Sequence, residues 1–322
     1  MHRKALYNLL KFTSIDKKPK NVENWQIEDL RKIDLDILFK KLHKFDIFLD
    51  NENFLKYSKN FFTPEEFSSF LSDEKDLQQR DQIYLIIFEL WRRFAQDKKS
   101  ISIFCDELDH RIFEYDNNKM KNDEKIQNHI SMIKSILDEN VDAGESHKKV
   151  FNDFTKFLAH DYENFLLDYI SDLIDIKNYS YALDLIDSYY SYFNAKNWLD
   201  FLKAKIFSVT NINSSKELFE NILLKLKNKS DLELQFRILD FLSYSLDRSL
   251  FISFSKEMFK IVENEKNFKC FLEILLNFFE RIDDEKKAAE IRKILKKRES
   301  IKKMSKLKKT NIDLLFLKKV IL

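Results

Sequence analysis

The segment Glu107–His110 comes nearest to a metal-binding pattern in this chain. Glu107 and His110 stand three positions apart, so a helix would place a carboxylate and an imidazole on one face, as in di-iron carboxylate bundles. Such a site needs a second copy of the motif and two further glutamates, and the sequence offers no second copy. We therefore interpret the pair as part of a solvated helix face and expect neither a metal nor another cofactor.

Other residue types with catalytic or ligating chemistry are present but are not grouped. The five other histidines show no zinc-ligand spacing with cysteine or with each other; they are His2, His43, His129, His147 and His160. One glycine in 322 residues excludes the glycine-rich loops that bind nucleotide phosphates. No Ser-His-Asp or Cys-His arrangement is recognisable along the sequence, although such groups can assemble in space. We expect a protein that is not an enzyme.

Two cysteines, Cys105 and Cys270, lie far apart in the sequence. This usage is typical of reduced thiols in a cytoplasmic protein rather than of a disulfide framework. Both fall within apolar stripes, which predicts that both are buried. No run of apolar residues is long enough for a signal peptide or a transmembrane span, so we expect a cytoplasmic location.

The C-terminal region is strongly basic. From Lys286 to Lys319 there are 14 Lys and Arg against three acids, a local net charge of +11; since the whole chain carries +2, the rest carries −9. Such a tail could contact nucleic acid, an anionic membrane or an acidic protein, or it could be a solvated helix. The absence of aromatic residues between Lys286 and Asp313 weakens the case for single-stranded nucleic acid. The basic residues that we single out are Lys296, Lys297, Arg298, Lys302, Lys303, Lys306, Lys308 and Lys309.

A group of aromatic residues is the second candidate for binding. The region 181–198 holds more aromatic surface than one core stripe needs, and exposed Tyr and Trp are common anchors at interfaces. Packing between hairpins is the alternative for each of them. The residues that we expect to include the partner-facing ones are Tyr189, Tyr190, Tyr192 and Trp198.

These residues must be positioned by helices. With one Gly and two Pro, the chain lacks the turn residues that a β-sheet fold of this size would use, so we predict an all-α fold. In the N-terminal part, Trp25–Leu49 is expected to be one helix, and Thr63-Pro64 with Glu66 is a helix start. The apolar run Ile83–Phe88 predicts a helix that is buried nearly all round.

In the C-terminal part, apolar stripes recur at helical spacing in pairs separated by short polar breaks. They predict four helical hairpins, whose helices cover 163–176 with 181–193, 198–209 with 216–226, 232–246 with 250–262, and 268–279 with 285–295. Matching positions in the second helices are spaced by 35, 40 and 33 residues. These values bracket the periods of about 34 and about 40 residues found in helical repeat proteins.

At this point the chain resembles the tetratricopeptide-repeat family over residues 151–300. Leu166, Tyr169 and Leu173 stand at its large positions, and Ala182 and Ile186 at two positions of its second helix. The sequence departs from the family pattern where Ile170 replaces a small residue, Tyr189 an alanine and Asn194 the terminal proline. The resemblance implies a right-handed stack of hairpins, an α-solenoid, with a groove that binds protein.

We therefore expect residues 1–24 to be a flexible leader, 25–139 an N-terminal helical bundle, 148–300 the hairpin stack, and 301–322 a basic tail that ends in an apolar helix. Gly144 marks the expected boundary. The expected function is non-catalytic protein binding as an adaptor, scaffold or chaperone-like module. The alternative is association of the basic tail with nucleic acid or an anionic membrane surface.

The last twelve residues, 311–322, are too few to span a bilayer and too apolar to remain in water. We expect them to dock on the last hairpin, because the end of a repeat stack otherwise leaves an apolar face open. Contact with a membrane interface and capture by a partner are the alternatives.

Overall fold

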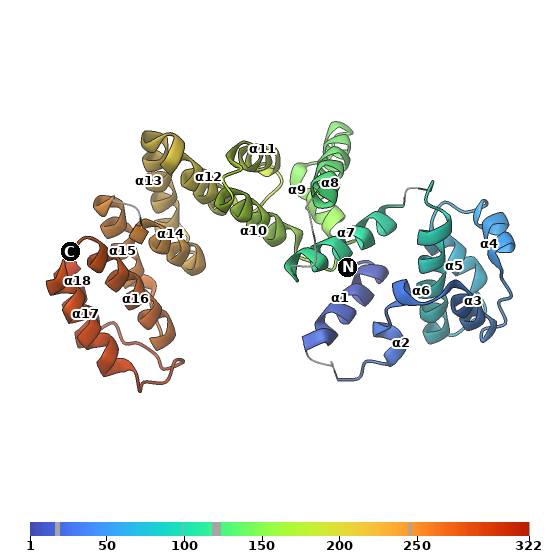
Figure 1. The fold of residues 1–322 in the computed structure, drawn as a ribbon, viewed down its shortest axis with the longest axis horizontal. Coiled ribbons are helices and arrows are strands. Elements are labelled where there is room, and N and C mark those ends of the chain that lie inside the picture. Colours follow the sequence, from blue (N-terminus) through green and yellow to red (C-terminus); the bar gives the residue numbers. More distant parts are fainter. Residues whose placement is uncertain (17–19, 99, 118–123, 245–246, 322) are drawn as a thin grey trace. The chain divides into compact units, whose positions relative to one another are not determined.

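The computed structural model describes residues 1–16, 20–98, 100–117, 124–244 and 247–321 (Figure 1). Within these residues the regular structure is helical, apart from an isolated antiparallel bridge between Asn264 and Lys306. The first ten helices are α1 (Arg3–Asp16), α2 (Asn24–Ile27), the 3-10 helix η1 (Leu30–Lys32), α3 (Leu35–His43), α4 (Asn51–Ser58), α5 (Pro64–Leu71), α6 (Leu77–Phe94), α7 (Ile101–Asp116), α8 (Glu124–Asp142) and α9 (His147–Thr155). The remaining helices are α10 (Tyr162–Asp175), α11 (Tyr179–Tyr189), α12 (Lys196–Thr210), α13 (Ile212–Asn228), α14 (Leu232–Tyr244), α15 (Arg248–Ile261), α16 (Glu265–Arg281), α17 (Glu285–Arg298) and α18 (Ile312–Ile321). The all-α prediction is confirmed.

The helices form two compact units. Unit 1 comprises Met1–Asp168 with Ser191–Phe193, and unit 2 comprises Tyr169–Tyr190 with Asn194–Leu322. The division therefore falls inside α10 and not at the expected boundary around Gly144. Gly144 does mark a turn, because its φ of 104° lies in the region that favours glycine, but a turn between helices that pack together does not separate two units. Helices α8 and α9 on either side of it are in contact.

Helix α6 is the centre of the first part of unit 1. Every residue from Ile83 to Trp91 is buried, as the apolar run predicts, and the helix contacts α3, η1 and α5. Helix α5 begins at Pro64, as expected: Thr63 Oγ1 accepts a hydrogen bond from the Glu66 amide at 3.2 Å, which satisfies one of the free amides of the first turn.

The expected single helix over Trp25–Leu49 is wrong. The structure has α2, η1 and α3 in its place, separated by extended residues at Glu28 and Ile33. The Arg93 guanidinium explains the break, since its Nη2 donates to the carbonyls of Leu30, Arg31 and Ile33 at 2.9–3.1 Å. A side chain from α6 thus satisfies carbonyl groups that a continuous helix would have satisfied internally.

The expected flexible leader over residues 1–24 is also wrong for its first part. Residues 3–16 form α1, which buries Ala5 and Tyr7 and contacts α2 and α7. Tyr7 packs in a small core with Tyr84 and Phe88. The sequence shows α1 as an amphipathic segment but does not show which helices its apolar side packs against.

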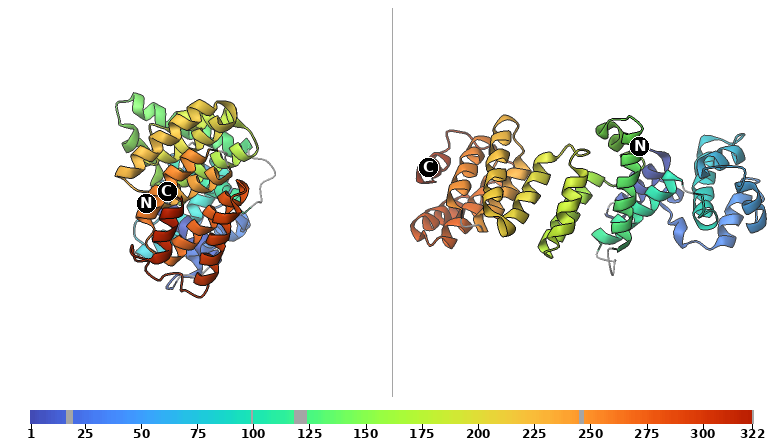
Figure 2. Two further views of the ribbon diagram at one scale, coloured as in Figure 1. Left: turned by 90° about the vertical axis from the view of Figure 1, so that its left-hand side faces the viewer. Right: turned by 90° about the horizontal axis from the view of Figure 1, so that it is seen from above.

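Unit 2 is built from helical hairpins, which can be followed in Figures 1 and 2. Helix α12 contacts α13, α14 contacts α15, and α16 contacts α17; between hairpins, α11 contacts α12, α13 contacts α15, and α14 contacts α16. One apolar core runs through these helices and includes Phe201, Phe254 and Phe278. The eight helices expected from the stripes are therefore present, with ends that differ from the predicted ones by a few residues.

The C-terminal segment docks on unit 2, as expected. Helix α18 contacts α15 and α17 and buries Leu314 and Leu317 in the core. Before it, residues 303–307 form a strap along the start of α16. The Glu265 amide donates to Ser305 O at 2.9 Å, the Lys266 amide to Lys303 O at 2.8 Å, and the Leu307 amide to Glu263 O at 2.8 Å.

Ala182 on α11 is fully buried, which supports a first prediction. Replacing it by leucine should lower the melting temperature, because extra methylene groups in a packed site typically cost roughly 1–3 kcal/mol. Thermal unfolding followed by circular dichroism measures the change, with Ala143→Leu as the control because Ala143 is exposed. An unchanged melting curve for Ala182→Leu would contradict close packing at this helix.

Candidate functional site

Two of the four aromatic residues singled out from the sequence are buried and therefore cannot face a partner. Tyr189 and Tyr192 are at most 2% exposed. The Tyr192 hydroxyl donates to Asp138 at 2.5 Å, and the His147 ring lies 4.9 Å from its ring. Burial and the hydrogen bond to Asp138 raise the pKa of Tyr192. For these two residues the core alternative is correct.

The other two, Tyr190 and Trp198, are partly exposed. Trp198 Nε1 donates to Asp231 at 3.1 Å, and the Lys196 ammonium lies 5.0 Å from the centre of the Tyr190 ring. Burial and the neighbouring Asp200 raise the pKa of Tyr190. Their polar atoms are thus engaged within unit 2, and neither residue lines the hollow that the structure shows between two hairpins of that unit.

That hollow is a groove between the α12–α13 and α14–α15 hairpins, with a volume of about 730 Å³. Its buried lining residues are Ser215, Phe219, Leu242 and Leu250. Toward solvent it is lined by Ile212, which is 74% exposed, and Tyr244, which is 58% exposed. Large apolar side chains at the edge of an apolar hollow are a common property of sites that bind another molecule.

The groove is shaped by helix ends, and each end is fixed by a specific side chain. Asn211 Oδ1 accepts from the Ser214 amide at 3.2 Å and starts α13, while Asp247 Oδ1 accepts from the Leu250 amide at 3.0 Å and starts α15. The Arg281 guanidinium donates to Ser243 O at 2.6 Å and lies 4.8 Å from the centre of the Tyr244 ring. Tyr244 is therefore held in place although its ring is exposed.

The groove carries positive charge at its rim. Lys216 and Arg248 line it, both are exposed, and neither forms an ion pair among the described residues. Asp247, the acidic residue of the lining, accepts the capping bond of α15. An apolar interior with two unpaired cations fits a segment that presents apolar side chains beside carboxylates.

Comparison of the chain with protein-family models, with curated proteins and with solved structures found no match. The likeness to tetratricopeptide repeats therefore depends on the residues quoted above.

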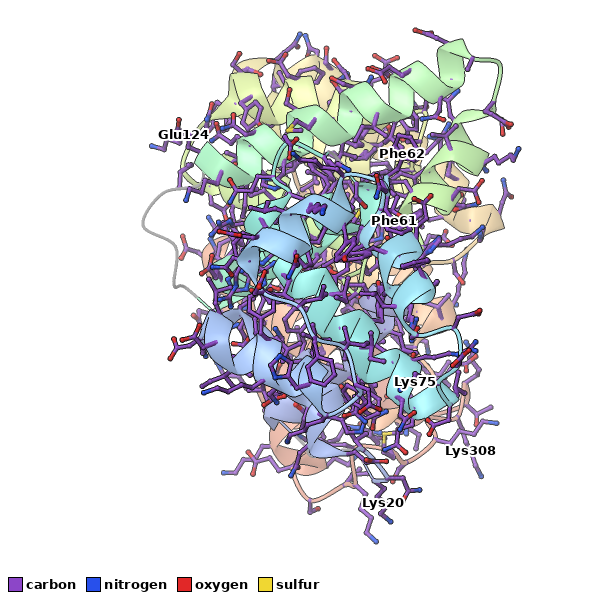
Figure 3. All side chains as sticks on the ribbon, turned by 90° about the vertical axis from the view of Figure 1, so that its right-hand side faces the viewer. Lys20, Phe61, Phe62, Lys75, Glu124 and Lys308 are labelled. Atoms are coloured by element: carbon purple, nitrogen blue, oxygen red, sulfur yellow. The ribbon has the colours of Figure 1, made fainter. Side chains whose placement is uncertain are left out.

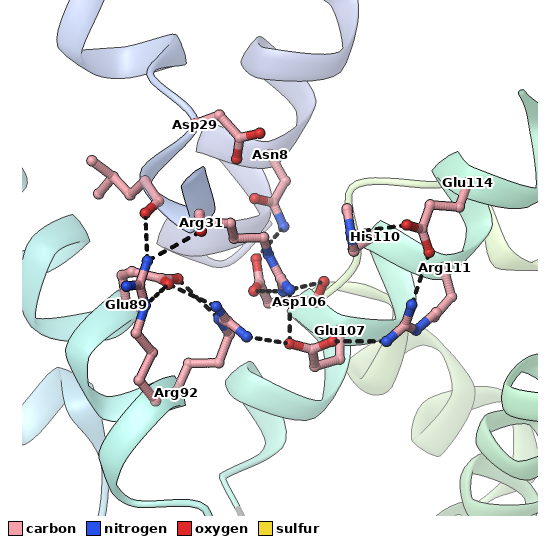
Figure 4. A network of polar contacts seen from close by, with 12 residues as sticks. Asn8, Asp29, Arg31, Glu89, Arg92, Asp106, Glu107, His110, Arg111 and Glu114 are labelled. Atoms are coloured by element: carbon pink, nitrogen blue, oxygen red, sulfur yellow. Dashed lines mark hydrogen bonds and ion pairs between the residues drawn. The ribbon is translucent and has the colours of Figure 1, made fainter. Parts of the chain in front are cut away.

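The Glu-x-x-His pair of α7 belongs to a network of ion pairs in unit 1 (Figure 4). Glu107 accepts from Arg31 at 2.8 Å and from Arg92 at 3.3 Å. His110 lies 3.4 Å from Glu114, and burial and the Arg31 charge lower its pKa. The described residues hold no group of three or more His, Cys, Asp or Glu side chains that could bind a metal ion. In this structure Glu107 is an acceptor for arginines.

The same network contains two buried aspartates on α7 that the sequence did not reveal. Asp106 accepts from Lys4 at 2.9 Å, Asn8 at 2.9 Å and Arg31 at 2.5 Å. Although burial raises the pKa of Asp106, the charges of Lys4 and Arg31 outweigh this effect and hold it well below its usual value. Asp109 accepts from the Ala159 and His160 amides and from His160 Nδ1 at 2.9–3.1 Å. The two carboxylates thus connect α7 with α1, η1 and the segment after α9.

The basic residues of the C-terminal region divide into two groups. Arg298 is buried and pairs with Asp313 at 2.5 Å and with Glu265, and Lys297 lies 3.2 Å from Asp313. Lys309 donates to Lys260 O. These three residues hold the segment in place. The others are exposed; they are Lys296, Lys302, Lys303, Lys306 and Lys308, the last labelled in Figure 3.

Unit 1 also has an exposed aromatic surface, at the connection between α4 and α5. Phe61 and Phe62 follow one another here (Figure 3), and Phe62 is 81% exposed. The rings of Phe61 and Phe70 lie 5.3 Å apart. The Lys98 ammonium donates to Ser58 O and Phe61 O at 2.6–2.7 Å and fixes this connection. The paired phenylalanines at 61–62 were the sequence signal for this surface.

The cysteines differ from each other. Cys105 is buried, and burial raises the pKa of its thiol, whereas Cys270 is exposed, so its expected burial is wrong. Cys270 lies on the solvent side of α16. The sequence did not show this because apolar residues surround position 270 along the helix. In the part of the chain that the structure describes, no helix has both the length and the apolar character needed to cross a bilayer.

Proposed function

We propose that this protein is a non-catalytic binding module that takes an acidic, amphipathic segment of a protein partner into the groove between the α12–α13 and α14–α15 hairpins. The observation that carries the proposal is the apolar hollow of about 730 Å³ with Ile212 and Tyr244 exposed at its edge. Helix-in-groove recognition uses such a surface, with apolar anchors at helical spacing.

A right-handed stack of hairpins, an α-solenoid, is the architecture that we propose for unit 2. The contacts of α13 with α15 and of α14 with α16 support it, because corresponding helices of successive hairpins meet in such stacks. A stack of this kind exposes the ends and one face of each hairpin, and the groove lies where α12 passes into α13 and α14 is followed by α15. An adaptor, scaffold or chaperone-like role follows from such a surface.

The test selects peptides from a phage-displayed library with the full chain. We expect enriched sequences to combine acidic with large apolar residues, because the rim cations Lys216 and Arg248 have no ion-pair partner among the described residues. Ile212→Asp should weaken binding of an enriched peptide at least about fivefold, since loss of an anchor contact costs more than about 1 kcal/mol. Fluorescence anisotropy measures the dissociation constant.

The matched control is Ile176→Asp, which places the same charge at another exposed isoleucine of unit 2, outside the groove. It should bind the peptide as the unchanged protein does. Equal binding by Ile212→Asp and Ile176→Asp would assign the binding to another surface. Enrichment of sequences without acidic residues would contradict the proposed role of Lys216 and Arg248.

A further inference from the structure

The strap and the start of α18 combine free positive charge with exposed apolar side chains. Four lysines of this region are exposed and form no ion pair among the described residues: Lys302, Lys303, Lys306 and Lys308. Between them Met304 is 82% exposed, and Ile312 at the first turn of α18 is 79% exposed. The apolar side chains that dock the segment, Leu307, Leu314 and Leu317, are buried instead.

The backbone of the strap gives these side chains a fixed direction. Lys306 forms the isolated antiparallel bridge with Asn264, and around such a bridge successive side chains point to opposite sides. Because Leu307 is buried, Lys306 and Lys308 point away from the core. Three backbone hydrogen bonds between the strap and residues 263–266 hold this arrangement against unit 2.

The local charge is not cancelled by neighbouring acids. The acidic residues that flank the strap are Glu263, whose carbonyl accepts from Leu307, and Glu299, whose carbonyl accepts from Lys269 at 3.3 Å. Glu265 and Asp313 are already paired with Arg298, and Asp313 also lies near Lys297. The Lys266 amide donates a hydrogen bond to the strap. If Lys266 is counted with the four exposed lysines, five positive charges face the two negative charges of Glu263 and Glu299.

We propose that this face, Lys302–Lys308 with Ile312, binds the surface of an anionic lipid bilayer. Lysines next to exposed apolar side chains match an anionic interface, where the ammonium groups meet lipid phosphates and carboxylates while apolar side chains enter the boundary of the acyl region. The strap carries no aromatic residue on which a nucleobase could stack. The surface is separate from the peptide groove and could act while that groove is occupied.

The experiment is co-sedimentation of the full chain with large unilamellar vesicles of phosphatidylcholine, with and without about a third of phosphatidylserine. We expect binding to the anionic vesicles that weakens as salt is raised, since surface charges are screened. Replacing Lys302, Lys303, Lys306 and Lys308 together by glutamine should weaken it several hundred-fold, because each basic residue near an anionic surface contributes about fivefold. The double substitution Met304→Ser with Ile312→Ser should weaken binding to the anionic vesicles several-fold. It should also lower the fraction of binding that remains at high salt.

The matched control replaces four other exposed lysines of unit 2 by glutamine, Lys227, Lys229, Lys256 and Lys286, so that net charge is equal. This variant should keep most of the binding. If both variants lost binding equally, the vesicles would be attracting the protein through its net charge alone. If the protein bound neutral and anionic vesicles equally, the lysines would have no role. Either result overturns the proposal. Failure to sediment with vesicles, together with tight binding of a single-stranded RNA oligomer, would overturn it in favour of nucleic acid.

Discussion

Deletion of residues 311–322 is expected to produce a protein that aggregates. The deletion removes Leu314 and Leu317 from the core of unit 2 and removes Asp313 from the buried Arg298. Each buried leucine contributes about 2–5 kcal/mol, and a buried charge that loses a partner adds a further penalty. The sum is a large fraction of the stability of a typical domain. Static light scattering and binding of a hydrophobic dye measure the exposed surface.

Single substitutions in α18 show whether the loss of stability comes from the buried contacts of this helix or only from shortening the chain. Leu317→Ala should lower the free energy of unfolding by about 3 kcal/mol, whereas Leu315→Ala, on the solvent side of the same helix, should change it by less than about 0.5 kcal/mol. Urea denaturation of the full chain gives both values. A deletion variant that stays monomeric and as stable as the full chain would mean that α18 does not complete this core.

The hairpin helices could be predicted from the sequence because their stripes are regular and their breaks are polar. In α10 the apolar positions repeat over the whole helix. In α5 the capping residue Thr63 followed by Pro64 marks the first turn of the helix. The same local information fails where a distant group decides the backbone. The break in the expected helix after Trp25 depends on Arg93, more than sixty residues away, and no spacing within 25–49 contains that contact.

The candidate site was harder to predict than the fold for a related reason. Aromatic content singled out residues 189–198, but the pattern does not say which rings are buried, and the structure places Tyr189 and Tyr192 in the core. The groove depends on the ends of four helices that meet in space. Its sequence signal, Ile212 at the first position of α13, reads as an ordinary apolar residue until the structure shows it in solvent.

Asp106→Asn is expected to destabilise unit 1 strongly at neutral pH. The substitution keeps the shape of the side chain but removes the charge that lies 2.9 Å from Lys4 and 2.5 Å from Arg31. Loss of one partner from a buried ion pair costs about 3–5 kcal/mol, because the remaining charges stay buried. Urea denaturation should therefore show a loss of about 3 kcal/mol in the free energy of unfolding.

The pH dependence of this loss identifies its cause. The pKa of Asp106 is lower in the folded chain than in the unfolded chain, because Lys4 and Arg31 favour the carboxylate despite its burial. A depressed pKa contributes stability that is fully present above the unfolded value of about 4 and is lost as the pH falls further. The difference between Asp106→Asn and the unchanged protein should therefore be constant from pH 7 to about pH 5 and should shrink below about pH 4.

The control for this experiment is Asp153→Asn. Asp153 pairs with Lys156 at 2.5 Å on the exposed surface of α9, where water screens the interaction. Its substitution should leave the denaturation curve at pH 7 nearly unchanged. If the cost of Asp106→Asn were the same at pH 3 as at pH 7, the loss would come from packing or hydrogen-bond geometry, and the buried charge would not be what holds α1 and η1 on α7.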